Sequence, residues 1–312
     1  MASRAKKALL LTTGIAALGG AVALGVQAYR HPREMMNRTL RTGLLALGVR
    51  EGTCDAAGVP MRYYSAGRRG SPLVLIHGLG SSAESWTALM PLLSRSYLVY
   101  APDLPGFGQT PMAPEGATID TYVRYLERFL DCLGYPRVVL AGNSLGGWIA
   151  ARFAVEHPER VERLYLLNSA GLSRESMNPP YATDRESARR TMKHLWGYDL
   201  PLPGFVLDAV VRNSQSPAYK QFFQHYRPQD DLDSVLDQVQ APTTIIWGER
   251  DGIFPIICAR DLHAGIPGSE LIFLPRVAHM AQLQAPLTVA RIMLNGAQKP
   301  SVGLTSASSG KE

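Results

Sequence analysis

Short apolar runs alternate with amphipathic stretches along most of the chain. Apolar and β-branched runs bounded by Gly or Pro are typical of strands, and longer stretches with apolar residues three or four apart are typical of helices. The predicted strands span residues 59–64, 73–77, 97–101, 138–140, 161–167, 243–247 and 270–274, and the predicted helices residues 84–93, 119–133, 148–154 and 286–294. Strands separated by helices predict an α/β fold, with a mostly parallel, doubly wound sheet covered on both faces.

This alternation stops between residues 171 and 240. Three short helices are predicted there, over 181–196, 204–211 and 218–225, with prolines between them and no strand among them. We interpret this segment as a helical cap inserted into the core. Its apolar residues are expected either to line an acyl pocket or to pack against the core: Phe205, Val206, Leu207, Phe222 and Phe223.

The amino-terminal segment is apolar and is flanked by basic residues. Residues 8–29 carry no charge over 22 positions, and a helix of that length rises about 33 Å, enough to cross a bilayer core. We predict a single-pass membrane anchor that contacts membrane lipid. A cleaved signal peptide, giving a secreted or periplasmic protein, is the alternative because Val26-Gln27-Ala28 offers small residues to a peptidase. The anchor is favoured because the apolar part of a signal peptide usually covers only about 7 to 15 residues.

Residues 35–47 follow this segment and place Met36, Leu40, Leu44 and Leu47 at helical spacing. Two interpretations have equal weight: a juxtamembrane helix in the lipid interface, or a short helix that covers the core. The predicted organisation is an anchor and juxtamembrane helix in residues 1–50, an α/β core in 51–170 and 241–297, a cap in 171–240 and a flexible tail in 298–312, which is rich in Ser, Gly and Lys.

Composition and charge narrow the class of protein. With 312 residues, 46% of them hydrophobic and 19% charged, the chain can bury a full core. The net charge of +6 comes from the first 50 residues, which hold eight Lys or Arg against one Glu, so the remainder is close to neutral. This distribution argues for a basic cluster beside a membrane and against a nucleic-acid partner.

The cysteines and the short motifs imply no cofactor. Cys54, Cys132 and Cys258 are widely spaced, odd in number and without a C-x-x-C pair, so we expect buried thiols rather than a disulfide framework or a zinc site. No metal-ligand spacing and no dinucleotide fingerprint occurs in the sequence.

Ser144 lies in Gly142-Asn-Ser-Leu-Gly146, between a predicted strand and a predicted helix. This is the setting of a nucleophile elbow, in which strand, turn and helix pack so tightly that only glycine fits two residues before and after the serine. The pentapeptide alone is a weak signal. The strand and helix around it make Ser144 the candidate nucleophile.

A serine hydroxyl needs a base within hydrogen-bond reach and a group that orients this base. Asp251 and His279 each follow a predicted strand directly, which brings them to the same edge of the sheet as Ser144. Glu249 competes as the acid. The competing bases are His77, His157, His194, His225 and His263, but only His279 lies in the loop after the last strand.

His77-Gly78-Leu79-Gly80 follows another predicted strand. A glycine-flanked loop there can turn a backbone N–H towards the serine, so we expect the N–H groups of Leu79 and Leu145 to form an oxyanion hole. Such donors contribute about 3 to 4 kcal/mol in the transition state. We expect His77 to brace this loop.

Together these motifs resemble the α/β-hydrolase superfamily from about Val59 to Leu294. The resemblance is carried by His77-Gly78, by residues 103–108, 142–147 and 248–251, and by His279. The anchored amino-terminus followed by this core looks like the monoacylglycerol lipase branch. The chain order Ser, Asp, His is that of the superfamily.

The resemblance implies a membrane-associated serine hydrolase that cleaves acyl esters, including monoacylglycerol or other lipid-like esters, through an acyl-enzyme. Ser144 argues against the members that use an aspartate nucleophile. Carbon–carbon bond hydrolases share the 142–147 motif but typically carry Trp after the catalytic His, where this chain has Met280. They remain the alternative, and a non-catalytic binding protein of this fold is a third possibility.

Overall fold

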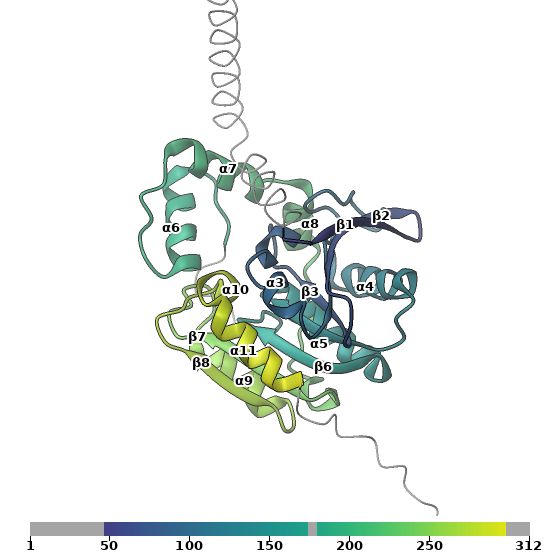
Figure 1. Cartoon of the computed structure of the whole chain (residues 1–312). Coiled ribbons are helices and arrows are strands. Elements are labelled where there is room, and N and C mark those ends of the chain that lie inside the picture. The colour runs from purple at the N-terminus through teal and green to yellow at the C-terminus, as the bar shows by residue number, and fades with distance from the viewer. Residues whose placement is uncertain (1–46, 174–179, 298–312) are drawn as a thin grey trace, which may run out of the picture.

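The computed structural model describes residues 47–173 and 180–297, in which eight strands form one sheet of order β1-β2-β4-β3-β5-β6-β7-β8 (Figure 1). The strands are β1 Arg50–Ala56, β2 Val59–Ala66, β3 Pro72–Ile76, β4 Leu98–Pro102, β5 Val138–Asn143, β6 Val161–Leu167, β7 Thr243–Gly248 and β8 Glu270–Leu274. Strands β3 to β8 pair in parallel, whereas β1 pairs with β2 and β2 with β4 in antiparallel fashion. The predicted α/β fold with a mostly parallel sheet is confirmed.

Helices cover both faces of the sheet. They are α3 Met90–Leu93, α4 Ile119–Leu133, α5 Leu145–Glu156, α9 Ile256–Gly265, α10 Ala281–Gln284 and α11 Pro286–Ala297. Buried residues of α4, α5 and α9 form one apolar cluster with the sheet, and those of α3 and α11 form a second. Because each helix buries one apolar side, the sheet is enclosed between two layers.

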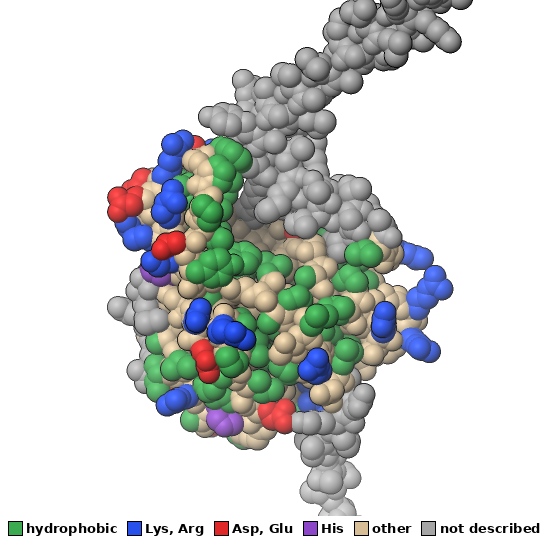
Figure 2. Space-filling view, turned by 60° about the vertical axis from the view of Figure 1, so that its left-hand side comes forward, with side chains coloured by type: hydrophobic (Ala, Val, Ile, Leu, Met, Phe, Trp, Pro, Cys, Tyr) green, Lys and Arg blue, Asp and Glu red, His purple; other side chains and the backbone are tan. Residues whose placement is uncertain are grey.

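Three more helices lie between β6 and β7: α6 Arg185–Trp196, α7 Gly204–Ser214 and α8 Pro217–His225. Ala182, Ala188 and Leu207 form a small apolar cluster of their own, whereas Phe222 joins the main core. The surface of α6 carries charged side chains (Figure 2), among them the ion pair Arg190–Glu186. That this segment is a cap, with the boundaries 171 and 240, remains our proposal.

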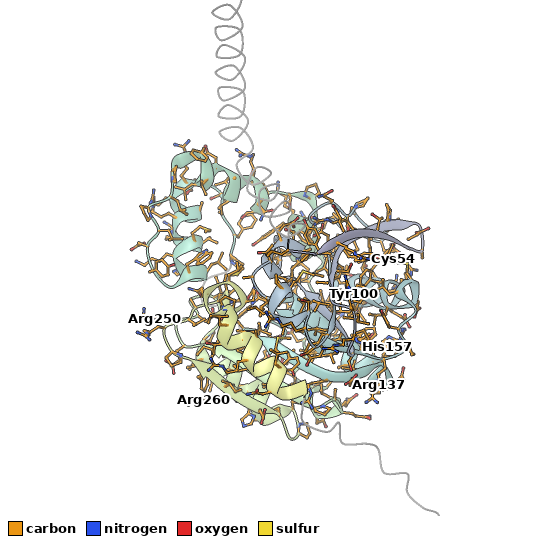
Figure 3. The ribbon with its side chains drawn as sticks, viewed as in Figure 1. Cys54, Tyr100, Arg137, His157, Arg250 and Arg260 are labelled. Carbon is orange, nitrogen blue, oxygen red and sulfur yellow. A yellow bond between two sulfur atoms is a disulfide. The ribbon has the colours of Figure 1, made fainter. Side chains whose placement is uncertain are left out.

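The structure corrects three expectations about the core. Strand β1 was not predicted, and residues 84–93 form a 3-10 turn, Ala83–Trp86, and the separate short helix α3 instead of one helix. Cys54 of β1 and Cys132 of α4 form a disulfide bond (Figure 3), so the expectation of three buried thiols is wrong for this pair. Cys258 is a buried free thiol, as expected.

The predicted anchor, residues 8–29, lies outside the described residues, as do most of the helix expected at 35–47 and the tail at 298–312. Within residues 47–173 and 180–297, no helix has both the length and the apolar character needed to cross a membrane. The predicted localisation as a single-pass membrane protein is therefore corrected, because the structure gives it no support. The anchor and its contact with membrane lipid are therefore not part of the function proposed below.

Candidate active site

Ser144 occupies a strained turn between β5 and α5. Its backbone φ is 56°, a left-handed value that residues other than glycine rarely adopt. A Cβ on Gly142 would collide with the carbonyl oxygen of Gly146, and one on Gly146 would collide with that of Ile76. The two glycines are thus required by close approach of the backbone. The serine itself is partly exposed and accessible to a substrate.

Asp251 and His279 lie in the loops after β7 and β8 and contact each other directly. The His279 Nδ1 atom lies 2.9 Å from Oδ2 of Asp251, and the two side chains are only 3% and 1% exposed. Since the carboxylate accepts a hydrogen bond from Nδ1–H, the neutral imidazole keeps its lone pair on Nε2. His279 therefore has the tautomer that a general base requires.

The Asp251 carboxylate is surrounded by hydrogen-bond donors. Its Oδ1 accepts the backbone N–H groups of Ile253 and Phe254 at 2.8 and 3.1 Å. Its Oδ2 also accepts the Asn168 side-chain amide at 2.7 Å. Asn168 is fully buried directly after β6, and it was not predicted from the sequence. Its one available signal was its place directly after a predicted strand.

The residue before Ser144 connects the elbow to the base. The Asn143 side-chain amide donates to the carbonyl oxygens of Leu167 and His279, both at 3.1 Å. Gln282 in turn donates to the Asn143 Oδ1 atom at 3.1 Å. The sequence motif gave no role to Asn143, which occupies the position between Gly142 and Ser144. In the structure it joins the Ser144 turn to the backbone of His279.

The loop after β3 packs against the elbow. A Cβ on Gly78 would lie 3.2 Å from Cβ of Ser144, so the next residue, Leu79, lies beside the candidate nucleophile. Leu145 is the first residue of α5, where a backbone N–H has no acceptor within the helix. Both residues predicted to form the oxyanion hole thus border the Ser144 turn.

His77 braces this loop, as expected. Its Nδ1 lies 2.8 Å from the carbonyl oxygen of Gly78, and its Nε2 accepts the backbone N–H of Leu104 at 3.0 Å. Because Nε2 accepts, the proton is on Nδ1, which donates to Gly78. The imidazole is completely buried and both of its nitrogens are engaged, which does not suit a general base.

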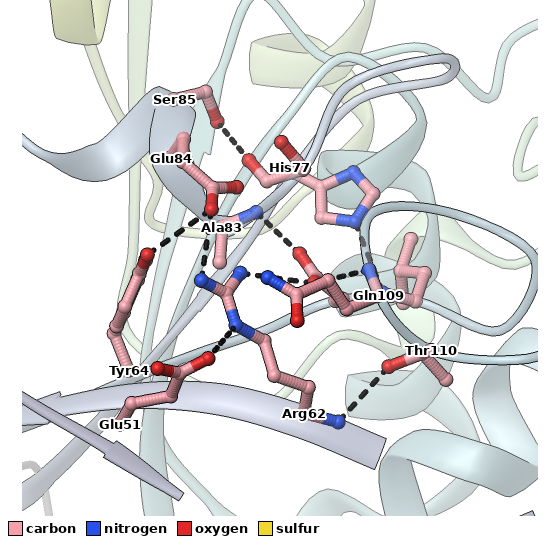
Figure 4. A network of polar contacts seen from close by, with 12 residues as sticks. Glu51, Arg62, Tyr64, His77, Ala83, Glu84, Ser85, Gln109 and Thr110 are labelled. Atoms are coloured by element: carbon pink, nitrogen blue, oxygen red, sulfur yellow. Dashed lines mark hydrogen bonds and ion pairs between the residues drawn. The ribbon is translucent and has the colours of Figure 1, made fainter. Parts of the chain in front are cut away.

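A buried ionic network extends from His77 towards the edge of the sheet (Figure 4). Arg62 of β2 contacts three carboxylates: Asp103 at 3.0 Å, Glu84 at 2.8 Å and Glu51 at 3.0 Å. Burial alone would raise the pKa of Glu84, but the hydrogen bond and the charge of Arg62 outweigh it, and the pKa lies below its usual value. The guanidinium thus holds Glu84 in its charged form.

Asp103 links this network to the loop after β3, residues 77–82, which is the candidate oxyanion loop. It accepts the backbone N–H groups of Ala83 and Gln109 at 2.8 and 2.9 Å. Its neighbour Leu104 donates to His77. Asp103 lies in the family motif of residues 103–108, whereas no motif or spacing in the sequence marks Arg62 or Glu84.

Among the side chains in the described ranges, no group of three or more His, Cys, Asp or Glu could hold a metal ion. The candidate catalytic side chains are Ser144, His279 and Asp251.

Comparison with known proteins gives the family. Residues 71–209 match the model of the alpha/beta hydrolase fold family. The chain is 32% identical over 260 residues to 2-hydroxy-6-oxo-6-(2'-aminophenyl)hexa-2,4-dienoic acid hydrolase of Metapseudomonas resinovorans, which covers 77% of this chain and 88% of that protein. The protein therefore belongs to the α/β-hydrolase superfamily, and it is a hydrolase.

Solved structures of two kinds of hydrolase are similar to this chain. A membrane phospholipase A described as a bacterial virulence factor has a TM-score of 0.77 at 25% identity, covering 93% of this chain and all of that one. A serine hydrolase involved in carbazole degradation has a TM-score of 0.67 at 30% identity, covering 79% and 98%. The finer prediction of a monoacylglycerol lipase branch is not confirmed by these matches.

Proposed function

We propose that the protein is a serine hydrolase that cleaves carboxylic acyl esters through Ser144, His279 and Asp251. The observation that carries this proposal is the buried contact of 2.9 Å between His279 and Asp251 in loops joined to the serine elbow. An aspartate and a histidine in this relation activate a serine hydroxyl in many unrelated folds.

In the proposed reaction, Nε2 of His279 takes the proton of Ser144 as its Oγ attacks the ester carbonyl. The N–H groups of Leu79 and Leu145 bind the oxyanion of the tetrahedral intermediate. His279 then gives its proton to the leaving alcohol, and an acyl-enzyme remains. Water that His279 deprotonates attacks the acyl-enzyme and releases the acid, while Asp251 stabilises the charged imidazole at each stage.

Two observations favour an ester, including lipid-like esters, as the substrate class. The likeness to a membrane phospholipase A extends over 93% of this chain. Met280 follows His279 at the position where carbon–carbon bond hydrolases typically carry Trp.

Among the apolar residues expected to line an acyl pocket, Leu207 and Phe222 are buried in apolar clusters, whereas Phe223 is 44% exposed. Of these three side chains, only that of Phe223 is accessible to a substrate.

Carbon–carbon bond hydrolysis is the second candidate, because a relative named as a dienoic acid hydrolase is 32% identical to this chain. The same serine, histidine and oxyanion donors serve this reaction, in which a carbon atom leaves instead of an alcohol oxygen.

The two candidates differ in what the purified protein cleaves. We would compare p-nitrophenyl esters of increasing chain length, monoacylglycerols and a 2-hydroxy-6-oxo-dienoate, each with wild type and with Ser144→Ala. Ester hydrolysis that disappears in Ser144→Ala supports the proposal. Cleavage of the dienoate alone moves the assignment to carbon–carbon hydrolysis, and a folded protein that cleaves none of them contradicts both.

A further inference from the structure

The oxyanion loop forms a tight turn with a fixed peptide orientation. The Gly78 carbonyl accepts the Ser81 backbone N–H at 3.1 Å, in addition to the bond from His77. Gly80, the third residue of this turn, has φ +68°, which is typical of a type II turn. Because a trans peptide directs its C=O and its N–H oppositely, bonds that hold the Gly78 carbonyl also determine where the Leu79 N–H points.

A side chain from the helices between β6 and β7 also bonds to this turn. The Asn213 side-chain amide, at the end of α7, donates to the carbonyl oxygen of Gly80 at 2.8 Å. This contact joins residues 133 positions apart in the chain. The accepting residue, Gly80, directly follows Leu79, the proposed oxyanion donor.

Packing makes this contact tight. A Cβ on Gly80 would lie 2.7 Å from Nδ2 of Asn213 and 2.8 Å from the Tyr219 ring of α8. Tyr219 is 2% exposed, and its hydroxyl donates to the carbonyl oxygen of Pro180. The turn is therefore enclosed by α7 and α8 and has little room to shift while Asn213 stays bonded.

The same helical segment also bonds to the other catalytic loops through its backbone. The carbonyl oxygens of His194 and Leu195, at the end of α6, accept the N–H groups of Gly252 and His279, both at 3.2 Å. A substitution cannot remove these backbone bonds selectively. Asn213 is the side chain through which the coupling can be tested.

We propose that Asn213 is a positioning residue that couples the segment between β6 and β7 to the oxyanion hole. By holding the Gly80 carbonyl, it fixes the peptide whose Ser81 N–H bonds to the Gly78 carbonyl. Because the Gly78 carbonyl shares its peptide with the Leu79 N–H, this contact keeps that N–H directed at the oxyanion. This inference rests on the proposed serine mechanism. It predicts that loss of the Asn213 side chain weakens binding of the transition state, which lowers kcat, but leaves binding of the substrate in the ground state unchanged.

The test compares Asn213→Ala and Asn213→Asp with the control Gln215→Ala, whose side chain is exposed just beyond the same helix. Asn213→Asp keeps the shape of the side chain but replaces the donor by an acceptor. For the ester that wild type cleaves best, we expect both Asn213 variants to lower kcat about ten-fold, the effect of roughly one hydrogen bond. KM should change less than two-fold, and Gln215→Ala should match wild type in both parameters.

The affinity for a trifluoromethyl ketone tests the oxyanion hole directly, because the adduct of this inhibitor with the serine carries an oxyanion. The melting temperature shows separately whether the variant has lost structure. The affinity for the inhibitor should fall by the same factor as kcat, while the melting temperature of Asn213→Asp stays near that of wild type. Unchanged kcat in both variants, or an equal loss in Gln215→Ala, overturns the role of Asn213. Failure of wild type to react with a fluorophosphonate overturns the serine mechanism instead, so the two failures are distinguishable.

Discussion

Asp251 has a hydrogen-bonding environment that suits one task, which is to accept a hydrogen bond from Nδ1–H of His279. The carboxylate receives donors from His279, Asn168, Ile253 and Phe254. Each bond restricts rotation of the carboxylate, so the imidazole is oriented without entropic cost at the moment of reaction.

Replacing Asp251 by asparagine tests this role with little change of shape. The amide NH2 would face Nδ1 of His279 and favour the tautomer with its proton on Nε2, which cannot accept from Ser144. We expect kcat to fall about 10,000-fold. Ester hydrolysis and thermal unfolding are the measurements, with the exposed Asp237→Asn as control. Activity within ten-fold of wild type in a folded Asp251→Asn protein would rule out this acid.

The candidate triad was predictable from sequence because Ser144, Asp251 and His279 each follow an apolar run that ends at one edge of the sheet. Asn168 and Asn213 were not predictable in the same way. Their partners lie 83 and 133 positions away in the chain, and a single Asn in a loop or at a helix end has no periodic pattern around it. Such contacts depend on how loops pack, which hydrophobic spacing does not encode.

At the scale of elements, buried Arg62 joins β2 to the loop after β4 and to the 3-10 turn Ala83–Trp86. Asp103 and Glu84, which it contacts there, are 0% and 6% exposed. Removing the cation leaves two carboxylates in a site with little access to water. A buried ion pair with one partner removed is strongly destabilising.

We therefore expect Arg62→Met to lower the free energy of unfolding by about 3 to 5 kcal/mol. The matched control is Arg124→Met, because Arg124 contacts Glu115 at 3.6 Å but is 45% exposed, and exposed pairs contribute about 1 kcal/mol or less. Urea unfolding followed by circular dichroism measures both. Equal effects of the two substitutions would contradict a structural role for the buried network.

Most elements of the core follow from the sequence pattern, and the exceptions have physical causes. The helix at 119–133 and the strands at 161–167 and 270–274 have the predicted bounds. Strand β1 lies at the sheet edge and reads Arg-Glu-Gly-Thr-Cys-Asp-Ala, with mostly exposed or half-buried residues, so it lacks an apolar run. In the 84–93 stretch, Pro91 cannot donate to a preceding turn, and α3 begins only at Met90.

At the scale of the whole molecule, loops from separate strands and from the helices between β6 and β7 converge on one edge of the sheet. Parallel strands direct their carboxyl ends to the same side, where active sites of such sheets form. Ser144, Asp251 and His279 follow β5, β7 and β8, while the oxyanion loop follows β3. The helices between β6 and β7 contact these loops through His194, Leu195 and Asn213.

The disulfide between Cys54 and Cys132 joins the edge strand β1 to α4 across 78 positions. A crosslink that closes such a loop restricts the unfolded chain, and we expect it to add about 3 to 5 kcal/mol to the free energy of unfolding. Reduction, or Cys132→Ser, should lower the melting temperature. The unfolded protein should release one reactive thiol, that of Cys258, without reductant and three with it. Three thiols without reductant would contradict the crosslink.

The proposed mechanism depends most on Ser144 being the nucleophile. The direct measurement is the intact mass of the protein, followed by peptide mapping, after reaction with a fluorophosphonate. We predict a single adduct on Ser144 in wild type, much slower reaction in His279→Ala, and none in Ser144→Ala. An adduct that forms equally in wild type and in Ser144→Ala would contradict the serine mechanism.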